Sequence, residues 1–147
     1  NLLIKNDNMS LNYFINTAII DSKYTSSYVS GVVGKKVEFV PNLNLKTGIK
    51  FGFSNFIFNV QYSFISKQFT DSSNATEGNI SGIIGEIPQY QLLDASMSYL
   101  IRKFKFEVGI NNLTNTYYFT RRATGYPGPG IIPSPPRNFY LTFQIKI

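Results

Sequence analysis

Residues 56–67 read FIFNVQYSFISK, and the alternation within this stretch decides the fold class. Large apolar side chains occupy every second position, namely Phe56, Phe58, Val60, Tyr62 and Phe64. The intervening positions are mostly polar and end on Lys67. A helix would scatter these two sets around its axis, whereas a strand places them on opposite faces. The stretch therefore predicts a β-strand with one apolar face, long enough to cross a bilayer at a tilt, which takes roughly 9–11 residues.

The same period of two recurs in five other segments. It is most regular in residues 36–51 and 138–147, and less regular in residues 11–22, 90–101 and 104–112. In residues 11–22 the polar set also contains Phe14 and Ile20. Pro41 lies near the start of residues 36–51, where a missing N–H is tolerated at an edge or rim. We therefore expect six long antiparallel strands.

The expected connections alternate between short and long. Residues 52–55 and 102–103 predict tight turns, whereas residues 23–35, 70–89 and 114–136 are long polar links. Outer-membrane barrels have this arrangement, with short periplasmic turns and longer external loops. Aromatic side chains gather beside the short turns, as a girdle at the membrane interface would. These residues are Phe51, Phe53, Phe56, Phe58, Tyr99, Phe104 and Phe106.

The patterns together predict an all-β fold, a fragment of a transmembrane antiparallel β-barrel. The alternative is a soluble β-sandwich, whose strands also alternate. Sandwich strands usually have about 5–6 residues, and the longer strands predicted here favour the barrel. Bacterial barrels begin at about 8 strands, so six cannot close one. We therefore expect the first and last strands to have open edges and the chain to be a piece of a larger protein.

The composition excludes several classes of function. The 147 residues include 13 Phe and 10 Tyr but no Trp, Cys or His. Disulfides, thiolate chemistry, zinc fingers and histidine-based catalysis are therefore excluded. The eight acidic residues form no convincing catalytic pair, so we predict no enzyme activity, no catalytic residue, no metal site and no cofactor. The formal net charge is +6, but the cations are scattered, which argues against nucleic acid as a partner.

The end of the chain contains motifs of a known family. Residues 111–115, NNLTN, followed by Tyr117 and Tyr118, resemble the N-L-[TF]-[DN]-x-x-Y signature near the end of TonB-dependent outer-membrane receptors. Residues 136–141, PRNFYL, resemble the G-R-x-[FY] entry to that family's last strand. Residues 69–74, 85–88 and 119–133 are similar to the ferric-citrate branch of the family. The chain departs from the family at Ile147, where an aromatic residue is usual.

The resemblance implies a barrel of roughly 22 strands with an N-terminal plug domain, located in the bacterial outer membrane. Residues 1–147 would be the C-terminal portion of that barrel, with the plug domain and the earlier strands outside this sequence. The implied function is uptake of a ferric chelate, such as ferric citrate or a similar siderophore, driven by the TonB complex through a missing N-terminal region. The expected surroundings are outer-membrane lipid. One alternative function is the uptake of another large ligand, such as haem, cobalamin or an oligosaccharide. Another is a structural or adhesive barrel that transports nothing.

Arg121 and Arg122 are the candidate ligand-binding residues. In the expected last external loop, their guanidinium groups could bind carboxylate oxygens of an anionic iron chelate. They could instead pair with loop carboxylates or with phosphates of the outer leaflet. Arg137 is expected to anchor the start of the last strand. The Pro/Gly-rich residues 125–136 are expected to form either a rigid loop or a plain connector.

Six lysines are expected on the polar face, and therefore in the interior of the barrel. Their charge could steer an anionic ligand inward or pair with acidic groups of the plug domain, and we favour the second hypothesis. They are Lys36, Lys46, Lys50, Lys67, Lys105 and Lys146.

Overall fold

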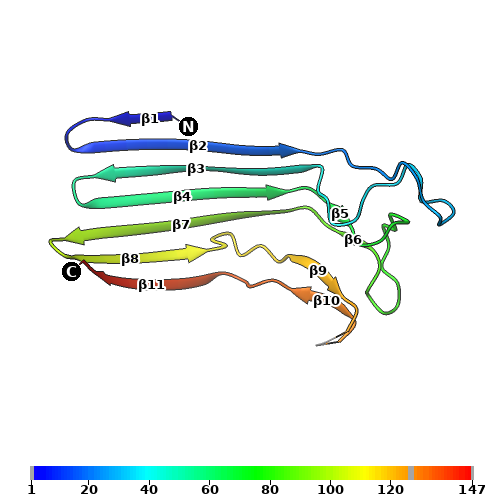
Figure 1. Ribbon diagram of the computed structural model, residues 1–147. Helices are drawn as coiled ribbons and strands as arrows, with labels where there is room; N and C mark the ends of the chain where they lie inside the picture. Colours follow the sequence, from blue (N-terminus) through cyan, green and yellow to red (C-terminus); the bar gives the residue numbers. More distant parts are fainter. Residues whose placement is uncertain (1, 126–127, 147) are drawn as a thin grey trace.

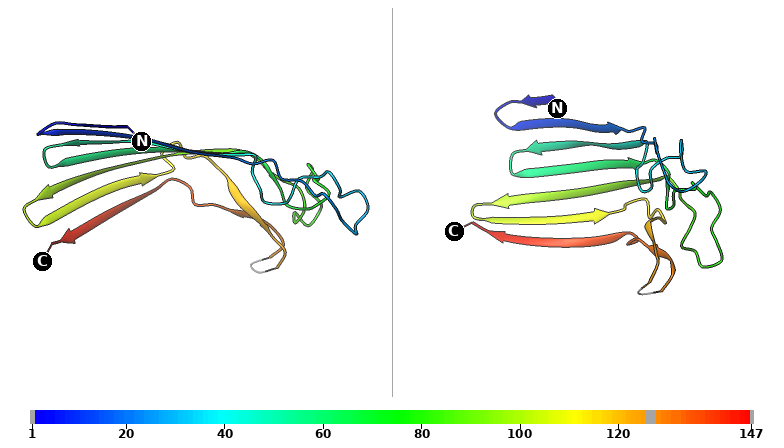
Figure 2. Two further views of the ribbon diagram at one scale, coloured as in Figure 1. Left: turned by 45° about the horizontal axis from the view of Figure 1, so that its top comes forward. Right: turned by 45° about the vertical axis from the view of Figure 1, so that its right-hand side comes forward.

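The computed structural model describes residues 2–125 and 128–146. Its main element is a seven-stranded antiparallel sheet in the order β1-β2-β3-β4-β7-β8-β11, in which each strand pairs with the next main strand along the chain (Figure 1). Figure 2 shows this sheet as a single curved layer. The strands are β1 (Leu2–Lys5), β2 (Met9–Ile19), β3 (Leu43–Phe53), β4 (Phe56–Ile65), β7 (Tyr90–Ile101), β8 (Phe104–Asn111) and β11 (Asn138–Ile145).

One face of the sheet is continuously apolar, because the register aligns the apolar positions of neighbouring strands. Phe58 lies opposite Phe51 of β3 and Met97 of β7. Leu141 of β11 lies opposite Val108 of β8. A shift of one residue in the pairing of any strand would move all the apolar side chains of that strand to the other face. The two predicted faces of the strand at residues 56–67, and of its neighbours within the sheet, are therefore confirmed.

Three long segments leave the end of the sheet opposite the short turns, and we call them together the loop extension (Figure 1). They are residues 20–42, 66–89 and 112–137, of which residues 126–127 lie outside the described part. Two small hairpins lie within them. Strand β5 (Gln68–Phe69) pairs with β6 (Glu86–Ile87), and β9 (Phe119–Ala123) pairs with β10 (Gly130–Pro133).

The sheet has no hydrophobic core of its own. Among the described residues, the buried hydrophobic side chains are Val32 and Ile87, and both lie in the loop extension. On the sheet, by contrast, Leu141 exposes 74% of its surface. A soluble domain packs at least two layers around a core, and in the described part of the chain no second large sheet covers the apolar face. This arrangement argues against the soluble β-sandwich.

The predicted short turns are confirmed. Ser54 and Asn55 join β3 to β4, and Arg102 and Lys103 join β7 to β8. Ser54 and Arg102 have φ angles of +50° and +52°, because a two-residue hairpin turn of the favoured hand needs a positive φ. The first of these turns is also bonded to the neighbouring strand β7, since the amide nitrogen of Leu100 donates to the carbonyl oxygen of Asn55 at 3.0 Å.

Aromatic rings pack against one another beside these short turns. The ring centroids of Phe56 and Tyr99 lie 4.2 Å apart. Phe143 of β11, which was not among the predicted girdle residues, lies 5.0 Å from Phe106 and 5.8 Å from Phe104. The rings therefore form a band across several strands at one end of the apolar face.

The polar face accommodates two aromatic rings by means of glycine. A β-carbon at Gly48 would lie 2.6 Å from the Phe14 ring and 2.7 Å from the carbonyl oxygen of Val60. A β-carbon at Gly109 would overlap the ring of Tyr140. Phe14 interrupts the polar alternation of β2, and the missing side chain at position 48 makes room for its ring.

Two of the strand predictions are wrong in part. The sheet has seven strands rather than six, because residues Leu2–Lys5 form β1 and pair with β2. One open edge of the sheet is therefore β1, and the other is β11, as predicted. The strand predicted over residues 36–51 begins only at Leu43. Phe39 has a φ of +57° and its amide nitrogen donates to the carbonyl oxygen of Phe69 at 2.9 Å, so this part of the chain is loop.

Candidate functional site

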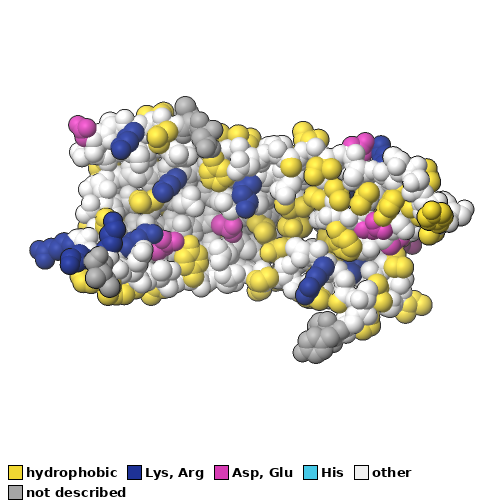
Figure 3. Space-filling model, in the orientation of Figure 1, with side chains coloured by type: hydrophobic (Ala, Val, Ile, Leu, Met, Phe, Trp, Pro, Cys, Tyr) yellow, Lys and Arg dark blue, Asp and Glu magenta, His cyan; other side chains and the backbone are white. Residues whose placement is uncertain are grey.

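The candidate site is the loop extension, where Arg121 and Arg122 lie. Several of its hydrogen bonds join segments that are distant in the sequence. The Pro/Gly-rich residues 125–136 include strand β10, which pairs with β9 and so favours a shaped loop over a plain connector. On the face of the molecule that Figure 3 shows, the sheet has few hydrophobic side chains and scattered cations, whereas the loop extension shows more hydrophobic surface.

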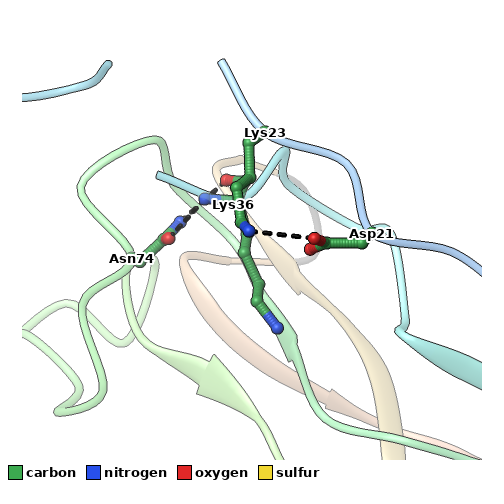
Figure 4. A network of polar contacts seen from close by, with 4 residues as sticks. All are labelled: Asp21, Lys23, Lys36 and Asn74. Atoms are coloured by element: carbon green, nitrogen blue, oxygen red, sulfur yellow. Dashed lines mark hydrogen bonds and ion pairs between the residues drawn. The ribbon is translucent and has the colours of Figure 1, made fainter. Parts of the chain in front are cut away.

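Asn74 joins the first long loop to the second. Its side-chain nitrogen donates to the carbonyl oxygen of Lys36 at 2.8 Å, and its side-chain oxygen accepts from the Lys36 backbone nitrogen at 2.7 Å (Figure 4). The side chain thus pairs with the backbone as a neighbouring strand would. Lys36 also forms a bridge with Lys23. It therefore lies in the loop extension, and the prediction that it lies on the polar face of a strand is wrong.

The first long loop contains two hydrogen-bonded side-chain pairs, and in each pair the pKa of one residue is shifted. The Lys23 ammonium donates to the carboxylate of Asp21 at 2.9 Å, and this hydrogen bond lowers the pKa of Asp21. The hydroxyl of Tyr24 donates to the carboxylate of Glu38 at 2.6 Å, which raises the pKa of Tyr24. An exposed ion pair such as Lys23–Asp21 contributes little to stability.

The NNLTN motif joins β7, β8 and β11 where they enter the loop extension. The side chain of Asn112 is buried, donates to the carbonyl oxygen of Thr116 at 2.9 Å and accepts from its backbone nitrogen at 2.8 Å. The backbone nitrogen of Asn112 donates to Asp94 of β7 at 2.8 Å. Asn115 accepts from the backbone nitrogen of Arg137 at 3.0 Å. Arg137 therefore anchors the start of β11 through its backbone rather than through its charge.

Arg121 and Arg122 both lie on β9 but have different surroundings. Arg121 is exposed. Arg122 is half-buried, and its guanidinium donates to the carbonyl oxygens of Gly82 and Glu86, both at 2.9 Å. It also lies 5.3 Å from the centroid of the Phe119 ring. Because successive side chains of a strand point to opposite sides, the structure does not bring the two arginines together as one fork.

The lysines predicted for the polar face differ in position and in whether they have a partner. Lys67 lies in the loop extension just after β4, not on the polar face of a strand as predicted, and it pairs with Glu86 of β6 at 2.9 Å. Lys105 of β8 pairs with Glu107 of the same strand at 2.6 Å. Both partners belong to this chain, which the sequence did not reveal. Two other lysines on the polar face of β3 have no carboxylate within 4 Å in the part of the chain that the structure describes, and these are Lys46 and Lys50.

Two kinds of feature are absent from the described residues. Within residues 2–125 and 128–146, no three His, Cys, Asp or Glu side chains gather as a metal site would require. In the same residues no helix is long and apolar enough to cross a membrane.

Comparison with solved structures identifies the fold. The chain matches a crystal structure of the ferric citrate transporter FecA in its unliganded form, with a TM-score of 0.83 and 24% sequence identity, over 95% of this chain and 21% of that one. It matches the ferric yersiniabactin uptake receptor FyuA from Yersinia pestis with a TM-score of 0.75 and 16% identity, over 95% and 21%. The copper transporter OprC matches with a TM-score of 0.66 and 15% identity, over 98% and 22%. No protein-family model matches the sequence.

These matches confirm the predicted fold class and, for the fold, the predicted resemblance to the barrel of TonB-dependent receptors. The chain has the all-β fold of a piece of the barrel wall found in TonB-dependent receptors. It spans about a fifth of the length of the structures that it matches, 21% of the ferric citrate transporter and 22% of the copper transporter. An open sheet is therefore the architecture that a piece of this barrel should have.

Proposed function

We propose that this chain is part of the barrel wall of a TonB-dependent receptor in the bacterial outer membrane, and that the receptor takes up a ferric chelate such as ferric citrate. The observation that carries the proposal is a sheet with one apolar and one polar face, whose long loops all leave the same end. The match to a ferric citrate transporter over 95% of the chain supports it.

The apolar face supports a location in the membrane. Each large apolar side chain gains about 1.5–3 kcal/mol when it moves from water to an apolar environment. Hydrocarbon provides that environment along the whole face, while the ladder of the sheet satisfies the backbone N–H and C=O groups. The aromatic band beside the short turns would then lie at the periplasmic interface, where such rings are enriched.

The rest of the receptor supplies the remaining partners in this proposal. Within the part of the chain that the structure describes, the outer edges of β1 and β11 pair with no further strand, and open edges call for further strands. A plug domain would face the polar side of the sheet, where Lys46 and Lys50 would meet acidic groups. Contact with the TonB complex would be made by an N-terminal region outside this sequence.

Arg121 is the residue that we assign to ligand contact. It is exposed on β9, in the loop extension. A guanidinium group binds carboxylate oxygens through two parallel hydrogen bonds, so it suits the carboxylates of a ferric citrate complex. Arg122, the second predicted ligand residue, is half-buried and bonded to the second long loop. We therefore assign direct ligand contact to Arg121 alone.

A different cargo is the second candidate function. It is supported by the copper transporter OprC, whose fold the chain also matches with a TM-score of 0.66. An exposed arginine would also suit the propionate carboxylates of haem or the phosphate of cobalamin, whereas an uncharged oligosaccharide would need other loop contacts. A structural or adhesive barrel would bind no such ligand saturably.

Binding of radiolabelled ferric citrate to the full-length receptor in outer-membrane vesicles tests the proposal. We expect saturable binding by the wild type and a loss of about tenfold or more in affinity for Arg121→Ala, because a hydrogen bond to a charged group contributes about 1.5–3 kcal/mol. Arg102→Ala is the matched control, since it removes an arginine from a short turn at the opposite end. Absence of binding by the wild type would exclude ferric citrate, and equal losses in both variants would contradict the assignment of Arg121.

A further inference from the structure

Arg122 binds the second long loop at Gly82 and Glu86, both of which are distant from it in the sequence. Its Nη1 donates to the carbonyl oxygen of Gly82, and its Nη2 donates to that of Glu86, both at 2.9 Å. The two acceptors lie 40 and 36 residues away in the sequence. Because the guanidinium is a rigid planar fork, this pair of bonds fixes the orientation of the loop as well as its position.

The loop and the β9–β10 hairpin also touch at the level of the backbone. A β-carbon at Gly82 would lie 3.1 Å from the Cα atom of Gly130 in β10, and one at Gly85 would lie 3.1 Å from Nη2 of Arg122. Gly82 and Gly85 have φ angles of +70° and +133°, which glycine adopts at low cost. The ring of Phe119 lies 5.3 Å from the guanidinium carbon on the β9 side. Arg122 thus occupies the junction of the two segments.

From these contacts we propose that Arg122 is a positioning residue, which locks residues 78–86 onto the β9–β10 hairpin and so holds Arg121 in place for an anionic chelate. The part that concerns the chelate rests on the function proposed above, whereas the lock itself does not. Carbonyl groups of the loop already take one hydrogen bond from each of the two terminal nitrogens of Arg122, and its Nε is buried, which limits the donors that a carboxylate ligand can reach. Arg121, on the same strand, is exposed and is the arginine that meets the ligand.

The substitution Arg122→Lys separates positioning from charge. A lysine keeps the positive charge, but its ammonium is a point donor on a flexible stem and does not reproduce the planar fork. If Arg122 acts by bridging two carbonyl oxygens, lysine fails to replace it. If Arg122 acts by attracting the ligand, lysine replaces it in large part.

Hydrogen exchange of the full-length receptor measures the lock directly, in peptides that cover residues 79–86. The amide of Gly82 donates to the carbonyl oxygen of Asn79 at 2.8 Å, and that of Gly85 donates to Oγ1 of Thr70 at 3.1 Å. We expect Arg122→Ala to raise their exchange rates about tenfold or more, because it removes two charge-assisted hydrogen bonds from this segment. Arg122→Lys should raise them nearly as much.

Two matched variants show whether the effect belongs to Arg122. Arg121→Ala should weaken ferric citrate binding without changing exchange in residues 79–86, whereas Arg122→Ala should change both. Asn74→Ala removes the bonds to Lys36 instead. It should raise exchange near residues 36 and 74 and leave residues 79–86 as they are.

The outcomes separate the lock from the proposed function. Unchanged exchange in Arg122→Ala would overturn the lock. If Arg122→Lys binds ferric citrate as tightly as the wild type while exchange in residues 79–86 is still raised, the positioning role is overturned. The ligand would then need only the positive charge at position 122. A wild-type receptor that binds no ferric citrate would overturn the proposed function, yet the exchange rates would still decide whether Arg122 holds the loop.

Discussion

The sheet and the loop extension are held together in different ways. In the sheet, an alternation repeated over many residues sets the register, and each main strand pairs with the next along the chain. In the loop extension, single side chains such as Asn74, Asn112 and Arg122 bond to backbone atoms between 4 and 40 residues away. A repeated pattern tolerates change at most positions, whereas a contact made by one side chain is lost with that side chain. Four predictions test this difference.

The largest effect is expected at the middle of β4, where two neighbouring residues face opposite ways. Val60 lies opposite Ile49 and Ala95 on the apolar face, and Gln61 lies opposite Gly48 on the polar face. We expect Val60→Arg to lower the free energy of unfolding by about 2–4 kcal/mol, since it places a charge in hydrocarbon, and Gln61→Arg by less than about 1 kcal/mol. Equilibrium unfolding of the receptor in lipid vesicles measures both, and equal costs would mean that the faces are assigned wrongly.

The next effect is expected at Asn112, in the loop extension. Asn112→Ala removes two hydrogen bonds to Thr116 and leaves a non-glycine residue at a φ of +53°. We expect a loss of about 2–3 kcal/mol in the free energy of unfolding. Asn112→Gly should recover about 1 kcal/mol of this, because glycine takes a positive φ without a steric cost. No difference between alanine and glycine would show that the backbone angle contributes nothing here.

A smaller effect is expected from the two glycines on the polar face. In Gly48→Ala the new methyl group meets the carbonyl oxygen of Val60, which cannot turn away, so we expect a cost of about 1–3 kcal/mol. In Gly109→Ala it meets the ring of Tyr140, which can rotate, at a cost of about 1 kcal/mol. Thermal unfolding of the double variants checks the cause. Tyr140→Ala should rescue Gly109→Ala, whereas Phe14→Ala should leave most of the cost of Gly48→Ala.

The smallest effect is expected from the Tyr24–Glu38 pair in the first loop. The hydrogen bond to Glu38 raises the pKa of Tyr24 above its ordinary value of 10.0, so the folded loop favours the neutral phenol. The contribution of this bond is complete below pH 10 and is lost as the pH rises through the raised pKa. Glu38→Gln should bring the pKa back towards its ordinary value. Titration by ultraviolet absorbance, with Tyr24→Phe to identify the signal, measures the shift, and an unchanged pKa in Glu38→Gln would contradict this cause.

The sheet was largely predictable from the sequence because its order is local and periodic. The faces of β4 follow from alternation alone, without knowledge of the neighbouring strands. The errors have physical causes as well. Strand β1 begins with three consecutive apolar residues, from Leu2 to Ile4, and so shows no alternation. Residues 36–39 alternate, but Phe39 takes a positive φ and bonds to Phe69, which no pattern within the segment reveals.

The loop extension was not predictable in the same way. Its arginines could be named as candidates because they are charged and lie in a long polar link. The sequence could not show that Arg122 bonds to carbonyl oxygens 36 and 40 residues away, since every residue has such an oxygen and nothing in its identity marks it as an acceptor. The pairing of Lys67 with Glu86 is hidden for a similar reason, because a hairpin of two-residue strands brings them together.

The central claim is that the apolar face of the sheet meets lipid and the polar face meets the interior of a barrel. The most direct test replaces residues 56–65 of β4 by cysteine one at a time in a full-length receptor without other cysteines, to which residues 1–147 contribute none. A spin label is attached at each position, and the receptor is placed in lipid vesicles. Collision rates with oxygen, which concentrates in hydrocarbon, and with a charged nickel complex are then measured. The account predicts high oxygen collision at the even positions and low at the odd ones, with a strict period of two. Equal values along β4, or the opposite phase, would contradict it.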